Sequence, residues 1–373
     1  MIQQYPHWRV AGAAAAFVLA GSSAVALAMH AGSSGGAVAY QALPAPAGQH
    51  RAPAGTQTSA ARLGLALMTE AAVACRTTAF SGVQVFRWWG PDGSSVWLAN
   101  IWHRPGGQIV AEPVAGSAAA QTRSGSATMP EPSVSMTISA PQLARLQDGY
   151  LLTYTGLGSA DGRMAEVVAV QRPNGTLAAR YWLDRQTKLP LRRQLFDGRA
   201  RLVSDISFAS LRIGQSSLRG MPAASTRPWP RQLGLPEIAA LRAAGWPLPG
   251  ELPGQMDLVA ASRTATPTGT VVGLSYSDGL SVISLFVQRG QLPAQLNGWQ
   301  RISIAGHNAY AVDADAQTIA WSADGYVFTL LADAPVSTVD QAIAVLPHGG
   351  TTSFWDRLGR GFRRLVHWAN PFR

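Results

Sequence analysis

EVVAVQRPNGTLAARYWLDRQTKLPLRRQLF, residues 166–196, is the stretch that decides the fold class. It holds three runs rich in apolar and β-branched residues, Glu166–Arg172, Ala178–Asp184 and Pro190–Phe196. Asn174-Gly175, between the first two, is the residue pair favoured in two-residue hairpin turns, because Gly and Asn tolerate positive φ. The stretch therefore predicts three antiparallel strands joined by tight turns.

The same pattern extends outward from this stretch through the first half of the chain. Gly90-Pro91-Asp92-Gly93 and Arg104-Pro105-Gly106-Gly107 are strong turn signals between further apolar runs. Apolar residues at helical spacing predict a helix over Ala60–Cys75, and Pro141 in a first turn predicts a second over Ala140–Asp148. The first half is thus expected to be an antiparallel sheet with little helix. Its other expected strands are Phe80–Phe86, Ser95–His103, Gln108–Glu112, Tyr150–Thr155 and Leu202–Ile213.

A second β-rich region follows residues 214–240, which are rich in Gly, Ser, Pro and Arg and are expected to be a linker. Ser277-Asp278-Gly279 is expected to be the turn between two of its strands, and Val336–Leu346 a closing helix. Its expected strands are Asp257–Thr264, Val271–Ser277, Ser281–Arg289, Gln300–Ile304, Asn308–Asp313, Thr318–Ala323 and Tyr326–Ala332.

The two ends of the chain differ in composition from these two regions. Residues 1–28 hold Arg9 before an uncharged, Ala-rich run that ends in a small-x-small pattern. They are interpreted as a cleaved signal peptide, with an uncleaved N-terminal anchor as the alternative. Residues 29–59 are expected to be a disordered spacer, 60–213 the first domain, 241–348 the second and 349–373 a basic tail. In either interpretation the chain is exported to the extracytoplasmic side of the cell envelope.

Composition excludes several classes of site in the 373 residues. The single cysteine, Cys75, excludes an intramolecular disulfide and a multi-cysteine zinc site, and it is expected to be a buried, inert thiol. The seven histidines show no metal-ligand spacing, and His103 and His307, at strand ends, are expected to be surface turn residues. We find no nucleophile elbow, phosphate loop or zinc-protease motif. The sequence therefore predicts a protein that is not an enzyme and has no cofactor or metal.

Aromatic residues form the clearest cluster. Trp88, Trp97 and Trp102 fall on two neighbouring expected strands. Both faces of Ser95–His103 are apolar, which a sheet with one solvated face does not show. One interpretation is an ordinary core on one face with a helix on the other. The alternative is a concave sheet whose inner face, lined by these three tryptophans, binds acyl chains or a hydrophobic peptide.

Three segments resemble the MucB/RseB family of regulatory proteins. Tyr181–Arg192 is similar to the strand–turn–strand signature of the family, preceded by Glu166-Val167-Val168 and Asn174-Gly175-Thr176. Leu274–Ser281 resembles its C-terminal motif, and Gly245–Pro249 fits the approach to that motif. Phe80-Ser81-Gly82 with His103 resembles its N-terminal strands. The resemblance covers roughly residues 60–346.

The resemblance implies a mainly β (α+β) fold, with a LolA-like incomplete antiparallel β-barrel around helices and a smaller β-rich C-terminal domain. It also implies a non-catalytic regulator that binds the exported part of an anti-sigma factor and senses lipid or lipoprotein acyl chains in a hydrophobic cavity. The alternative is a lipid or lipoprotein carrier of the LolA type. In the C-terminal motif, Asp278-Gly279 is expected to serve the turn, and Tyr276 is the candidate contact for the partner.

Charge suggests further partners. The net charge is +10, and residues 185–201 carry six basic side chains against Asp197, so they are either a basic face for an acidic partner or an ordinary solvated surface. Nucleic acid is not expected as a partner, because the chain is exported. At about 100° per residue, residues 354–369 separate into an apolar arc and a basic arc. This pattern is typical of a helix that lies on a membrane surface, although docking on its own domain is the alternative. The residues assigned to membrane contact are Trp355, Arg357, Phe362, Arg363, Arg364 and Leu365.

Overall fold

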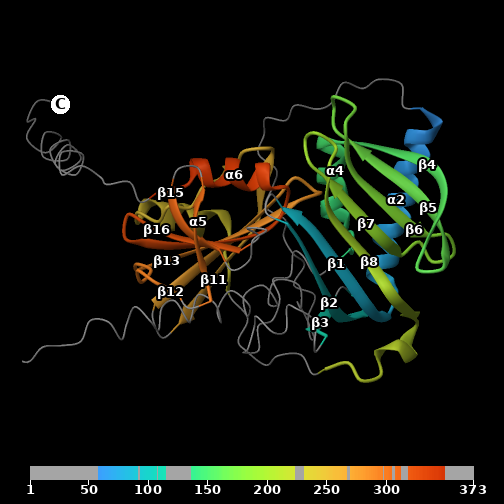
Figure 1. Cartoon of the computed structure of the whole chain (residues 1–373), viewed down its shortest axis with the longest axis horizontal. Coiled ribbons are helices and arrows are strands. Elements are labelled where there is room, and N and C mark those ends of the chain that lie inside the picture. Colours follow the sequence, from blue (N-terminus) through green and yellow to red (C-terminus); the bar gives the residue numbers. More distant parts are fainter. Residues whose placement is uncertain are drawn as a thin grey trace, which may run out of the picture.

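The computed structural model describes residues 58–90, 93–106, 108–114, 136–222, 231–266, 269–296, 298–304, 307–311 and 318–348. Two antiparallel sheets dominate this part, and few helices accompany them (Figure 1). Neither sheet closes on itself, so the expected α+β class with an incomplete barrel is confirmed.

The first sheet has eight strands in the order β3-β2-β1-β8-β7-β6-β5-β4. The quoted stretch supplies three neighbours in this order, β5, β6 and β7, as predicted. The turn at Asn174 is longer than expected: Arg172 and Thr176 close the hairpin, which leaves a three-residue loop with Gly175 at φ +81°. The strands are β1 Phe80–Gly90, β2 Gly93–Arg104, β3 Gln108–Pro113, β4 Leu151–Ala160, β5 Arg163–Gln171, β6 Leu177–Asp184, β7 Pro190–Phe196 and β8 Leu202–Ile213.

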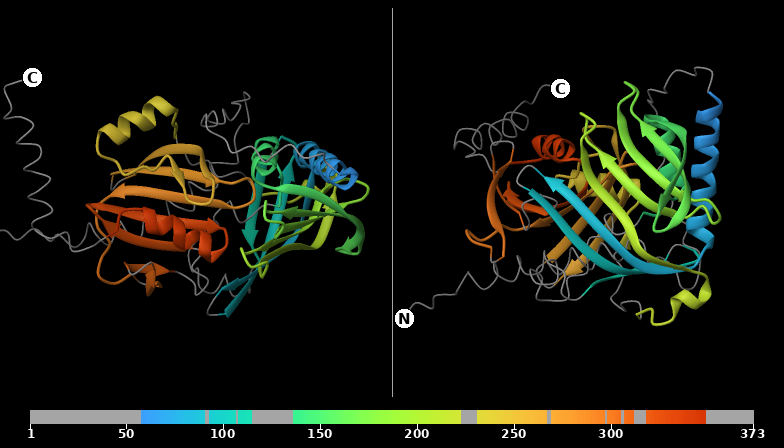
Figure 2. Two further views of the ribbon diagram at one scale, coloured as in Figure 1. Left: turned by 90° about the horizontal axis from the view of Figure 1, so that it is seen from above. Right: turned by 45° about the vertical axis from the view of Figure 1, so that its right-hand side comes forward.

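Two helices pack against this sheet, α2 (Ser59–Thr77) and α4 (Ala140–Gly149). Helix α2 lies beside β4, and the views in Figure 2 agree on this arrangement. Gly64 allows the close approach, because a Cβ at this position would lie 2.8 Å from the backbone nitrogen of Tyr154. Helix α4 begins with a capping box between Ser139 and Gln142, which satisfies amide groups at the helix start. Both helices confirm the sequence prediction.

The second sheet has nine strands, ordered β10-β11-β12-β13-β17-β16-β15-β14, with β9 paired to β11. Helix α6 (Val336–Val345) packs its Val339, Ala342 and Ile343 against the apolar core of this sheet. The strands are β9 Arg231–Gln232, β10 Glu251–Leu252, β11 Met256–Thr266, β12 Gly269–Ser277, β13 Val282–Arg289, β14 Gln300–Ile304, β15 His307–Ala311, β16 Thr318–Ala323 and β17 Tyr326–Asp333.

The segment expected as a linker contains regular structure. A 3-10 turn, η2 (Gln215–Leu218), follows β8, and residues 231–240 contain β9 and most of helix α5 (Leu235–Ala243). Ile238 of α5 is fully buried in the core of the second sheet. The second folded unit therefore begins by residue 231, whereas the composition predicted a start at residue 241.

Candidate functional site

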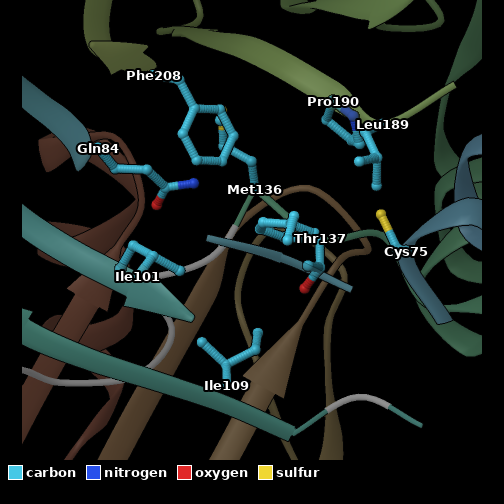
Figure 3. Close-up of a pocket in the computed structure, with 10 residues that line it drawn as sticks. Cys75, Gln84, Ile101, Ile109, Met136, Thr137, Leu189, Pro190 and Phe208 are labelled. Atoms are coloured by element: carbon cyan, nitrogen blue, oxygen red, sulfur yellow. The ribbon is translucent and has the colours of Figure 1, made fainter. Parts of the chain in front are cut away.

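An apolar pocket lies in the first sheet between β1, β2, β7 and β8 and the end of helix α2. Leu189 and Pro190 lie on the side of the pocket near Cys75, and Gln84 and Phe208 lie across from them (Figure 3). Its cavity volume is about 10 Å³, room for about one water molecule. An acyl chain would therefore have to widen the pocket in order to enter. The lining is completed by Phe80, Ile101, Ile109, Met136 and Thr137.

Besides Thr137, two residues with polar groups, Gln84 and Cys75, meet this apolar lining. Gln84 is only 2% exposed, and its Oε1 has no hydrogen-bond partner among the described residues. The Cys75 thiol accepts a hydrogen bond of 3.5 Å from the Ile138 amide, and burial raises its pKa to about 12. A thiol with so high a pKa is protonated at neutral pH and is a poor nucleophile. The predicted burial of Cys75 is confirmed.

The structure separates the three tryptophans assigned to a cavity. Trp97 pairs in register with Phe86, and their rings stack with centroids 3.6 Å apart. Trp97 and Trp88 occupy the same face of the sheet as the pocket residues Gln84 and Ile101, but neither lines the pocket. Trp102 alternates with Ile101 and lies on the opposite face. The prediction that all three share one cavity wall is therefore wrong.

The sequence analysis expected His103 to be exposed at a turn, but the structure buries this side chain. It is 1% exposed, its ring stacks on Phe80 at 4.7 Å, and its Nδ1 lies 3.0 Å from the carbonyl oxygen of Thr78. Burial lowers the pKa of His103 below its usual range, so the ring is neutral at neutral pH. The reason for the error is register: His103 opposes the buried Phe80 across β1 and β2. The side chain of His307 lies outside the described residues.

The turn between β12 and β13 meets the first sheet's helices. Oδ1 of Asp278 accepts hydrogen bonds from the backbone amides of Leu280 (2.9 Å) and Ser281 (2.6 Å), and Gly279 has φ +90°. The predicted turn role of Asp278-Gly279 is thus confirmed. The other carboxylate oxygen, Oδ2, accepts a 2.6 Å hydrogen bond from the Tyr150 hydroxyl at the end of α4. Leu280 packs into the core formed by α2, α4 and the first sheet.

A second contact joins the sheets through a buried ion pair. Nη2 of Arg193, on β7, lies 2.8 Å from both carboxylate oxygens of Asp333 at the end of β17. The two side chains are 7% and 1% exposed. Burial raises the pKa of Asp333, while Arg193 acts in the opposite direction. We call the contacts of Tyr150, Arg193, Asp278, Gly279 and Asp333 the joint.

Tyr276 is not at a surface. It is fully buried in the core of the second sheet, and its hydroxyl donates a 2.8 Å hydrogen bond to the carbonyl oxygen of Pro249. The side chain cannot contact a partner in this arrangement, so the partner contact assigned to Tyr276 is corrected. On β12 it alternates with Ser275 and Ser277, and its side chain faces the core.

The basic stretch 185–201 is largely neutralised within the molecule. Lys188 pairs with Glu166 and lies 3.7 Å from Glu70, and Arg201 pairs with Asp197. Arg193 is taken up by the joint, and Arg192 pairs with Asp205. This arrangement favours the ordinary interpretation of the stretch over a basic docking face.

Other sequence predictions concern residues outside the described part. The leader, the spacer and the tail residues Trp355, Arg357, Phe362, Arg363, Arg364 and Leu365 all lie there. Within the part of the chain that the structure describes, no helix is both long and apolar enough to cross a membrane. Nor do the described side chains include a group of three or more His, Cys, Asp or Glu suited to a metal ion.

The sequence analysis missed the pocket lining and the joint. Strand alternation was a usable signal for the lining, because alternate residues of a strand share a face. Ile101 shares its face of β2 with Ala99 and Trp97, and Gln84 pairs with Ala99. No local signal links Arg193 to Asp333, which are 140 residues apart. The described residues thus form a pocket and, separately, a joint. The lining of the pocket contains no acid–base pair among these residues.

Comparison with known proteins supports the resemblance. Residues 119–233 match the model of the MucB/RseB N-terminal domain. No curated protein matches the sequence. Among solved structures, MucB in complex with MucA(peri) is 18% identical, with a TM-score of 0.40, over 77% of this chain and 99% of that chain. The Pseudomonas aeruginosa MucA/MucB complex is 20% identical, with a TM-score of 0.39, over 77% and 100%. A LolA superfamily protein from Nitrosomonas europaea is 8% identical, with a TM-score of 0.18, over 74% and 96%. The family match covers residues 119–233, which contain α4 and β4 to β9, so this part of the chain is similar to the MucB/RseB N-terminal domain.

Proposed function

We propose that the protein is a non-catalytic extracytoplasmic regulator that binds the exported part of an anti-sigma factor. The observation that carries this proposal is the family match, which covers five consecutive strands of the first sheet. The expected partner is an anti-sigma factor of the same organism.

A capture experiment tests this proposal. The chain from residue 29 to 373 is immobilised and exposed to the purified ectodomain of that anti-sigma factor, with an ectodomain of similar length and charge from an unrelated membrane protein as the control. Specific retention, together with protection of the ectodomain from a site-specific protease, supports the proposal. A full-length, folded chain that retains neither ectodomain refutes it.

We also propose that the pocket takes up acyl chains. The pocket is apolar on nearly all sides, and Trp97 and Trp88 continue the same face of the sheet beyond Ile101. A chain that widens the pocket would therefore advance along an aromatic surface. Since the cavity in its present state has a volume of only about 10 Å³, uptake requires movement of the walls.

Fluorescent fatty-acid uptake by the full chain tests this second proposal. Phe208→Ala and Trp97→Ala should change uptake, whereas Trp102→Ala, on the opposite face, should not. Equal effects of Trp97→Ala and Trp102→Ala would contradict the assignment. A carrier of the LolA type would also transfer the lipid to an acceptor vesicle. A sensor would instead release its protein partner when it binds the lipid.

We further propose that the tail holds the protein against a membrane surface. The support comes from the sequence, where Trp355, Phe362 and Leu365 fall on an apolar arc and Arg357, Arg363 and Arg364 fall on a basic one. A peptide of residues 350–373 should gain helical circular dichroism on anionic vesicles and lose binding when Trp355, Phe362 and Leu365 become Ser. A peptide that stays unstructured on such vesicles would refute the idea.

A further inference from the structure

The joint between the sheets combines a hydrogen bond, an ion pair and a close backbone contact. The Tyr150 hydroxyl reaches Asp278 at 2.6 Å, and Arg193 reaches Asp333 at 2.8 Å. Gly279 lies directly on α4, because a Cβ at this position would stand 2.4 Å from the backbone nitrogen of Leu146. Through the joint, one turn and one strand end of the second sheet therefore pack against the unit of the first sheet.

The ion pair of the joint has little tolerance for displacement. Both partners are buried, and Nε of Arg193 has no hydrogen-bond partner among the described residues. Separating buried charges leaves each without its partner in a dry environment, which costs more than either the closed pair or the fully hydrated pair. A shift of β7 should therefore open the joint to water completely rather than stretch it slightly.

The pocket and the joint share β7. Pro190, the first residue of β7, lines the pocket together with Leu189, which directly precedes the strand (Figure 3). Arg193 lies three residues after Pro190 on the same strand. Tyr181 on β6 pairs in register with Arg193, and it belongs to the same core as Leu280 from the turn of the second sheet. The start of β7 and the residue before it thus form a pocket wall, and the middle of the strand holds the ion pair.

Close packing makes this shared strand a mechanical connection. A cavity of about 10 Å³ cannot accept a larger group unless a wall moves, and packed interiors transmit such strain instead of absorbing it. The wall formed by Leu189 and Pro190 is continuous with the backbone that positions Arg193. We propose that filling the pocket displaces β7 and opens the joint, so that pocket occupancy controls how the two sheets are held together. For a natural ligand, this inference rests on the proposed acyl-chain uptake.

The coupling can be measured without a ligand by filling the pocket from inside. Ile109→Phe adds an aromatic ring to the pocket lining. Val110→Phe is the matched control, because Val110 is its buried neighbour on β3 and pairs with Trp102 on the opposite face of the sheet. Spin labels on Ala66→Cys and Ala344→Cys, exposed positions of α2 and α6, report the distance between the two units by double electron–electron resonance. The buried Cys75 stays unlabelled. The double variant Tyr150→Phe/Asp333→Asn, which breaks the joint directly, gives the open reference.

Ile109→Phe is expected to add the longer-distance population of the open reference, whereas Val110→Phe keeps the wild-type distribution. A folded Ile109→Phe variant with the wild-type distribution overturns the proposal. If Ile109→Phe does not fold, Cys75→Val supplies a milder filling, and an unchanged distribution in that variant overturns the proposal equally.

Dodecanoate added to the labelled wild-type chain separates this inference from the proposed function. Binding with a longer distance supports both. Binding without a change in distance overturns the coupling and leaves the lipid site standing. Absence of binding, together with an open joint in the filled variant, supports the coupling and counts against the lipid site.

Discussion

The Tyr150 hydroxyl donates a 2.6 Å hydrogen bond to Oδ2 of Asp278, a residue 128 positions further along the chain. Tyr150 ends a helix of the first sheet's unit, and Asp278 begins a turn of the second sheet. One carboxylate therefore organises its own turn through Oδ1 and attaches that turn to the other unit through Oδ2.

The first prediction concerns the hydroxyl of this pair. Tyr150→Phe keeps the ring but removes the donor, and we expect the free energy of unfolding to fall by about 1.5–3 kcal/mol, the usual contribution of a hydrogen bond to a charged group. Chemical denaturation of the full chain measures this loss. Tyr154→Phe, on the neighbouring strand β4, is the control and should have a much smaller effect. Equal losses in the two variants would show that Tyr150 acts through packing alone.

The ion pair allows a double-mutant cycle. Arg193→Met or Asp333→Leu alone leaves a buried charge without its partner and should lower the free energy of unfolding by about 3–5 kcal/mol. The double variant should recover most of this loss, because apolar groups can fill the same space without desolvating a charge. Denaturation of the four proteins gives the interaction energy. Additive losses in the double variant would mean that the two side chains act independently.

Gly279, the glycine of the joint, is expected to tolerate substitution poorly. Gly279→Ala should cost about 1–3 kcal/mol from the positive φ alone, and more because the new Cβ would overlap α4. Gly175→Ala is the matched control, because its φ of +81° is similar but nothing lies within 4 Å of its Cβ position. The variant at 279 should also give the longer spin-label distance. If the two substitutions cost the same, α4 is not held by this turn.

His103 predicts a specific pH dependence. Burial lowers its pKa in the folded state below the unfolded value of 6.5, so its contribution to stability is present above about pH 6.5. That contribution is lost as the pH falls through the folded-state pKa, because the unfolded chain then binds a proton more readily. His103→Gln should remove this acid-sensitive part, and the two stability curves should converge as the pH falls from 7 to 5. Curves that stay parallel over this interval would refute the assignment.

Local sequence signals determined most of the elements. Apolar, β-branched runs with Asn174-Gly175 predicted β5 and β6, the Gly90-Pro91 turn signal separated β1 from β2, and helical spacing predicted α2, because these patterns depend on neighbours within a few residues. Helix α5 was missed because Gly234 and Pro236 at its start belong to a stretch with the composition of a linker. Asp278-Gly279 was correctly assigned to a turn for the same local reason.

Only the tertiary structure decided which surfaces these elements cover. Trp97 and Trp102 lie on opposite faces of β2, although the sequence analysis assigned them to one cavity wall. Which face carries the pocket depends on where α2 packs. Tyr276 looked like a contact residue beside its turn, and the assembled second sheet buries it. The sequence by itself determined strands, turns and the family resemblance, because each depends on short segments. The contacts from Tyr150 to Asp278 and from Arg193 to Asp333 exist only once two sheets built from distant parts of the chain have packed together.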